Sequence, residues 1–139
     1  MNAGKRFFDT NVLLYLHSSA DQRKQAIARR TLQECRDNGV IVVSTQVVQE
    51  FYVVGLRKLL IAPDVLRRLT VDLLDFFVEQ IEPAHILQAI WNSEHYQISF
   101  WDALILAAAD SSGASILYTE DLNHGQLYGR VRAENPFRS

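Results

Sequence analysis

Four carboxylates in the sequence follow or flank apolar segments: Asp9, Glu50, Asp102 and Asp121. A carboxylate near apolar elements is costly unless a partner compensates its charge. If the four converge, they repel one another at neutral pH and favour a bound cation. Mg²⁺ and Mn²⁺ prefer oxygen ligands in octahedral geometry and retain waters. Such an ion acidifies water and stabilises negative charge on a phosphodiester. The residue types therefore predict a Mg²⁺ site, with Mn²⁺ as the alternative ion.

Asp9 and Glu50 each have a purely structural alternative. Asp9 follows Phe7-Phe8 and is equally suited to cap the helix that begins after it. As a ligand, it projects from a strand end, where Thr10 or Asn11 can orient it. Glu50 lies beside an apolar helical stripe rather than opposite it, and the stripe consists of Val47, Phe51 and Val54. An edge carboxylate with its head in water is the other interpretation.

Asp102 and Asp121 also leave two interpretations open. Asp102 stands three residues after Ser99, as in a capping box, and a helix start also favours negative charge. Both roles are compatible with metal binding, because a helix start can aim a carboxylate into a crevice. Asp121 follows Thr119-Glu120 in a turn, where aspartate is common. Glu120 is adjacent, so the sequence does not decide which of the two acids reaches the metal.

The composition predicts one globular domain spanning residues 1–139. Hydrophobic residues make up 48% of the 139, enough for a core, and the net charge of −2 neither requires nor excludes nucleic acid. The single cysteine, Cys35, rules out an internal disulfide and a cysteine zinc cluster, which favours a cytoplasmic location. The longest apolar run, 103–109, is far shorter than the roughly 18 residues of a membrane span. We therefore expect no membrane association.

Apolar runs alternate with helical patterns along the chain. Strands are predicted at about 6–8, 40–43, 76–82, 115–119 and 131–132, and helices at about 11–17, 21–38, 45–59, 64–75, 83–95 and 100–112. Residues 120–129 are predicted as a loop or a short helical piece. This alternation predicts an α/β fold with a mostly parallel central sheet of about four or five strands and helices on both faces. In such sheets a ligand crevice lies beyond the carboxyl ends of the strands, which is where Asp9 and Asp121 fall.

The ordered set of motifs resembles PIN-domain ribonucleases, and specifically the VapC-type toxins of bacterial toxin–antitoxin systems. Asp9-Thr10-Asn11-Val12-Leu13 resembles the opening motif of that family, and Glu50 resembles its helical glutamate. The segments Ser99 to Ile105 and Thr119-Glu120-Asp121 resemble those carrying the third and fourth acidic residues. The resemblance extends over essentially the full length of the chain.

The resemblance implies a toxin that cleaves cellular RNA endonucleolytically with a Mg²⁺-activated water. Asp9, Glu50, Asp102 and Asp121 would be the metal-binding and catalytic residues, and Asn11, Ser99, Thr119 and Glu120 would support them. It also implies a homodimer and a cognate antitoxin, which in this family commonly occupies a helical groove corresponding to residues 47–75.

RNA contacts have weaker signals in the sequence. Cationic side chains gather at Arg23, Lys24, Arg29 and Arg30, and again at Arg57, Lys58, Arg67 and Arg68, although most such residues are solvated helix faces. Phe100, Trp101 and Tyr96 are able to stack on bases, but core packing is the commoner role of aromatic residues. The residue beside Asp102, Trp101, merits a test.

Two other function classes fit parts of the pattern. A receiver-like phosphotransfer module also gathers acids at strand ends, but it needs adjacent acidic residues after the first strand and a lysine after a late strand. This chain has a single Asp9 and then Thr119-Glu120-Asp121 at those places. A PIN-like binding protein without catalysis is the second alternative, and retention of all four carboxylates argues against it.

Overall fold

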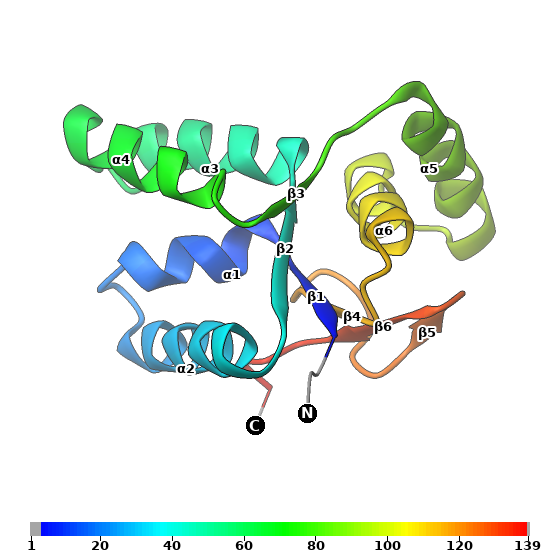
Figure 1. Ribbon diagram of the computed structural model, residues 1–139, viewed down its shortest axis with the longest axis horizontal. Coiled ribbons are helices and arrows are strands. Elements are labelled where there is room, and N and C mark those ends of the chain that lie inside the picture. The colour runs from blue at the N-terminus through cyan, green and yellow to red at the C-terminus, as the bar shows by residue number, and fades with distance from the viewer. Residues whose placement is uncertain (1–3, 139) are drawn as a thin grey trace.

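The computed structural model describes residues 4–138, and its centre is a six-stranded sheet in the order β3-β2-β1-β4-β6-β5 (Figure 1). The strands are β1 (Lys5–Phe8), β2 (Val40–Ser44), β3 (Phe77–Glu79), β4 (Ile116–Tyr118), β5 (Leu127–Tyr128) and β6 (Val131–Glu134). Every pairing is parallel except that of β5 with β6. The prediction of a mostly parallel α/β sheet is confirmed, with one strand more than the expected four or five.

Three of the helices begin after the N-cap residues that the sequence predicts, which are Asp21, Ser44 and Ser99. The helices are α1 (Thr10–Leu14), the 3₁₀ turn η1 (Tyr15–His17), α2 (Gln22–Asn38), α3 (Thr45–Arg57), α4 (Pro63–Leu73), α5 (Pro83–Tyr96) and α6 (Phe100–Ser112). The side chain of Asp21 accepts a hydrogen bond from Lys24 N, and that of Ser44 accepts one from Val47 N. Gly113 ends α6 with a φ of 84°, a conformation that glycine adopts without strain.

Helices cover both faces of the sheet, as predicted (Figure 1). On one face α6 contacts five of the strands, and α5 packs on its outer side; α1 and α2 lie on the other face. The helix α3 starts where β2 ends, and α4 packs tightly against it at Gly55. A Cβ on Gly55 would lie 2.7 Å from Leu66 Cδ1, so a larger residue there would force the buried Leu66 side chain to move. This packing fixes α3, the helix that carries Glu50.

One segment differs from the prediction. Residues 120–129 contain a loop followed by β5, which forms a hairpin with β6, and no helical piece. Gly129 has a φ of 62° in the two-residue turn between β5 and β6, where such values suit the twist of a hairpin. Tyr128 is buried, and its hydroxyl accepts a hydrogen bond from Asn123 N. Two residues are too few to show an alternating pattern, so the strand was missed.

Within residues 4–138, none of the helices combines the length and the apolar character required to cross a membrane.

Candidate metal centre

The pairing of β1 with β4 places Asp9 beside Thr119. Phe8 and Tyr118 are partners in the register, and Asp9 N donates to the carbonyl oxygen of Tyr118 at 3.0 Å, which continues the pairing by one residue. Thr119 Oγ1 then donates to Asp9 Oδ2 at 2.7 Å, and Thr10 N donates to Asp9 Oδ1 at 2.7 Å. Both carboxylate oxygens of Asp9 are therefore held in place by hydrogen bonds from the strand ends.

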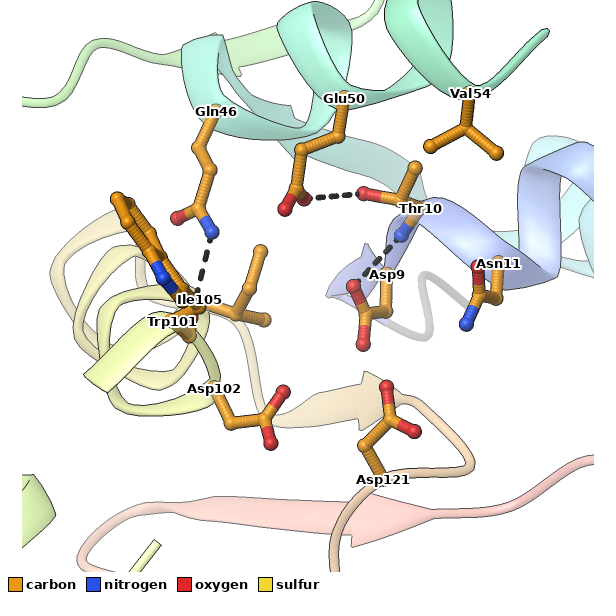
Figure 2. Close-up of a pocket in the computed structure, with 10 residues that line it drawn as sticks. All are labelled: Asp9, Thr10, Asn11, Gln46, Glu50, Val54, Trp101, Asp102, Ile105 and Asp121. Carbon is orange, nitrogen blue, oxygen red and sulfur yellow. Dashed lines mark hydrogen bonds between the residues drawn. The ribbon is translucent and has the colours of Figure 1, made fainter. Parts of the chain in front are cut away.

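Three aspartates converge at this edge of the sheet. One carboxylate oxygen from each of Asp9, Asp102 and Asp121 lies within 4.8 Å of the other two, although the three residues come from different parts of the chain (Figure 2). Asp102 points inward from the first turn of α6, whose cap Ser99 accepts a hydrogen bond from Asp102 N at 3.1 Å. Asp121 N donates to Thr119 Oγ1 at 3.1 Å. Thr119 thus contacts both Asp9 and Asp121.

Glu50 lines the same pocket from α3 but is not part of the close group of three (Figure 2). Thr10 Oγ1 donates to Glu50 Oε1 at 2.8 Å, so residue 10 holds Asp9 with its backbone and Glu50 with its side chain. Asp121, which the sequence leaves in competition with Glu120, lies close to Asp9 and Asp102, and Glu50 lies at the side of the group.

The structure does not bring Glu120 to the pocket, and this corrects its assignment as a supporting residue of the site. Its carboxylate accepts hydrogen bonds from the Tyr15 hydroxyl at 2.6 Å and from Lys24 Nζ at 2.8 Å. Successive residues after a strand point in different directions, so only one of Glu120 and Asp121 faces the pocket. Asn11 lines the pocket, as expected for a supporting residue.

The pocket concentrates negative charge. The ten residues that line it, all in the described part of the chain, include four carboxylates and no lysine, arginine or histidine. Burial raises the pKa of Asp9 from 3.8 to about 7, and the charges of Asp121 and Glu50 add to the rise, against hydrogen bonds from Thr119 and Thr10 that lower it. Partial burial, with the charges of Asp102, Glu120 and Glu50, also raises the pKa of Asp121. A cation in the pocket would relieve this repulsion.

Sequence reasoning missed two contributors to the pocket. Thr10 was considered only as an orienting partner of Asp9, and its bond to Glu50 depends on the contact between α1 and α3. Gln46 is buried and lines the pocket one helical turn before Glu50. Its Nε2 donates to the carbonyl oxygen of Trp101 at 3.3 Å and so links α3 to α6. The spacing of four residues between Gln46 and Glu50 was the available signal.

Comparison with protein families gives one match that spans most of the chain. The model of the PIN domain matches residues 6–129. The chain belongs to the PIN domain family. Comparison of this PIN domain with curated protein sequences gives no match.

Solved structures with the same fold come from bacterial toxin–antitoxin systems. A toxin–antitoxin complex from Klebsiella pneumoniae aligns with a TM-score of 0.71 at 21% identity, covering 94% of this PIN domain and 97% of that chain. VapC20 of Mycobacterium tuberculosis, described as a toxin that cleaves the sarcin–ricin loop, aligns with a TM-score of 0.68 at 22% identity over 84% and 89%. VapBC2 of Rickettsia felis, bound to a DNA fragment from its promoter, aligns with a TM-score of 0.65 at 16% identity, covering 94% of this PIN domain and 98% of that chain. These likenesses establish the fold.

Proposed function

We propose that this PIN domain is a divalent-cation-dependent endoribonuclease and the toxin of a toxin–antitoxin pair. The observation that carries the proposal is the convergence of three aspartates, with Glu50 beside them, in a pocket that no cationic side chain of the described residues lines. A structural role would favour an arginine or lysine partner for such a cluster. The description of VapC20 as an RNA-cleaving toxin supports the choice of RNA among phosphodiester substrates.

The donor set fits Mg²⁺ or Mn²⁺. All the converging ligand atoms are carboxylate oxygens, and the described residues of the pocket offer no thiol or imidazole that would favour zinc or copper. Asp9, Asp102 and Asp121 would hold the ion, and Glu50 would complete the site directly or through water. When bound, the ion would supply Lewis-acid chemistry, acidifying water and offsetting the charge that develops on a phosphodiester.

The remaining residues of the pocket set the geometry of these carboxylates. Thr119 fixes Asp9 and the backbone of Asp121 together, and Thr10 fixes Asp9 and Glu50 together. Ser99 stabilises the first turn of α6, from which Asp102 projects. Such hydrogen bonds to ligand carboxylates reduce the reorganisation needed when charge develops in the reaction.

An antitoxin is the proposed protein partner, and the surface formed by α3 and α4 is its proposed binding site. Large apolar side chains are exposed along both helices and their connection, namely Tyr52, Val53, Leu56, Leu60, Val71 and Leu74. An apolar helical surface of this kind suits a helix or an extended segment of a partner. A Val53→Asp variant should lose binding to the product of the adjacent reading frame while cleaving RNA at the wild-type rate. Retained binding would place the antitoxin elsewhere.

A homodimer is proposed on the basis of the resemblance to VapC toxins. Sedimentation of the purified protein without antitoxin should give twice the mass of the 139-residue chain, and a monomer at micromolar concentration would contradict this.

The nuclease activity is tested with two aspartates of α6. Asp102→Asn should abolish Mg²⁺-dependent cleavage of cellular RNA, whereas Asp110→Asn, which changes a half-buried acid on the same helix that pairs with Arg130, should leave it unchanged. Chelation of divalent cations should stop RNA cleavage by the wild-type protein as completely as the Asp102 substitution does. Cleavage by Asp102→Asn at the wild-type rate would refute the proposal. Cation binding without cleavage of RNA would favour a PIN-like binding protein.

A further inference from the structure

Trp101 occupies an unusual position at the rim of the acidic pocket. It precedes Asp102 in the first turn of α6 and lines the pocket with it (Figure 2). Its side chain is 63% exposed, whereas tryptophan is highly buried on average. A large exposed indole costs free energy in water, so its place at the mouth of the site calls for a ligand that covers it.

The indole is supported without being covered. Phe100 contacts it with ring centroids 5.2 Å apart and planes at 82°, and within residues 4–138 no other aromatic ring packs against it. Gln46 Nε2 holds the Trp101 carbonyl, although Gln46 Oε1 stays buried without a hydrogen-bond partner in the described structure. The hydrogen bond from Gln46 fixes the backbone of residue 101 relative to α3.

We propose that Trp101 is a stacking platform for an unpaired nucleobase next to the scissile phosphate. This inference rests on the proposed ribonuclease function and specifies its substrate class, namely RNA whose bases at the cleavage site are unstacked, as in loops and single strands. The sugar joins each base directly to the backbone, so a phosphate bound beside Asp102 brings a base within reach of the neighbouring side chain. Aromatic side chains stack on bases without sequence preference, and a base inside a duplex has no free face to offer.

The other exposed tryptophan shows why a base, and not a protein, is the better ligand for Trp101. Trp91 lies on α5 among the exposed aliphatic side chains Ile86, Leu87 and Ile90, and the ring of His95 stacks on it at 4.4 Å. Such an apolar environment suits a contact with another protein. Trp101 instead lines a pocket that contains four carboxylates, where a cation that attracts phosphate is proposed to bind. The charge of its surroundings thus favours a nucleotide.

Fluorescence tests the proposal without relying on catalysis. The chain has two tryptophans, so a Trp91→Phe variant leaves Trp101 as the sole indole fluorophore. We expect an eight-nucleotide oligoadenylate to quench this fluorescence in the presence of Ca²⁺, which replaces Mg²⁺ as a hard oxygen-binding cation. An abasic oligomer of the same length should bind weakly and quench little. Equal quenching by the two oligomers would overturn the proposal, because only one of them carries bases.

Substitutions at residue 101 provide the second readout. In fluorescence anisotropy with a labelled oligoadenylate, Trp101→Leu should bind roughly five- to hundred-fold more weakly than wild type, and Trp101→Phe should recover much of the loss. The Leu variant should also raise KM for RNA cleavage more than it lowers kcat. Its exposed position predicts normal thermal unfolding, which excludes misfolding as the cause.

Two outcomes separate this inference from the proposed function. If Trp101→Leu binds and cleaves RNA like wild type but loses binding to the antitoxin or to a second copy of the chain, Trp101 is a protein contact and the stacking proposal fails alone. If oligoadenylate quenches Trp101 but no RNA is cleaved under any condition, Trp101 stacks on a base that does not lie beside a scissile phosphate, and the nuclease proposal fails.

Discussion

Two neighbouring acids, Glu120 and Asp121, have opposite surroundings. Glu120 is bound by Lys24 and Tyr15. Both residues also contact Phe137: the ring centroids of Tyr15 and Phe137 are 4.9 Å apart, and Lys24 Nζ makes a cation–π contact with the Phe137 ring. We refer to Lys24, Tyr15 and Glu120 as the locking cluster. Asp121, one residue later, faces Asp9 and Asp102, and among residues 4–138 no cationic side chain lines that pocket.

The difference separates an acid that is neutralised within the protein from one that is available to a cation. The locking cluster compensates its carboxylate within the protein, and Glu120 in turn raises the pKa of Lys24. In the acidic pocket no cationic side chain of residues 4–138 compensates the acids, and burial, followed by the charges of Asp121 and Glu50, raises the pKa of Asp9. We expect the locking cluster to stabilise the fold by itself and the acidic pocket to reduce its stability, an effect that a bound cation would offset.

The largest expected effect is on the pH dependence of stability without metal. The pKa of Asp9 is about 7 in the folded state, against an ordinary value of 3.8 that applies to the unfolded chain. The folded state therefore binds the proton more tightly than the unfolded state does. In EDTA, this residue should therefore lower the free energy of unfolding as pH rises from about 4 to about 7, by on the order of 4 kcal/mol. Denaturant unfolding of wild type and Asp9→Asn at pH 4 and pH 8 measures this. The variant should be the more stable protein at pH 8, and a difference that does not change with pH would contradict the account.

The second prediction compares the two neighbouring acids directly. Asp121→Asn should reduce RNA cleavage roughly a hundred-fold or more, because it replaces one of the three converging carboxylates by a neutral amide. Glu120→Gln should retain most of the activity but unfold at a lower temperature. Cleavage assays and thermal melts on both variants are the measurements. If Glu120→Gln lost RNA cleavage and Asp121→Asn kept it, the assignment of the two acids would be reversed.

Thr119→Val is expected to have a smaller effect on the cation. The substitution keeps the shape but removes the hydroxyl that contacts both Asp9 and Asp121. Loss of such a partner typically weakens metal affinity by roughly ten- to hundred-fold. Calorimetric titration with Mn²⁺ measures the change. Unaltered Mn²⁺ affinity would show that the hydroxyl of Thr119 does not position the aspartates for binding.

The smallest effect is expected at the locking cluster. Lys24→Met removes an ion pair whose side chains are 27% and 18% exposed, so solvent screens it in part. The free energy of unfolding should fall by about 1 kcal/mol, less so in high salt. Urea unfolding at two salt concentrations tests this, and a loss that does not depend on salt would indicate that packing, not charge, stabilises the cluster.

The sequence predicts most of the fold because local signals agree with the tertiary structure. Asp21, Ser44 and Ser99 cap the helices that they were expected to cap. The short strand β5 was not predictable, because its two residues owe their conformation to pairing with β6.

The site was predictable in its members but not in its geometry. Asp9 and Asp102 have clear local contexts in a strand end and a helix start. Which of Glu120 and Asp121 faces the pocket depends on the bond between Lys24 and Glu120, two residues that are 96 positions apart. The sequence around residues 120 and 121 gives no sign of that contact. The contribution of Gln46 depends likewise on the approach of α6 to α3.

The central claim is that the converging aspartates form a divalent-cation site, and binding of Mn²⁺ to the protein without RNA tests it most directly. Titration followed by the free-ion electron paramagnetic resonance signal should show stoichiometric binding to wild type and to the Glu120→Gln control. Binding should be lost in Asp9→Asn, Asp102→Asn and Asp121→Asn. Failure of wild type to bind Mn²⁺, or binding by all three variants as tight as that of wild type, would contradict the account.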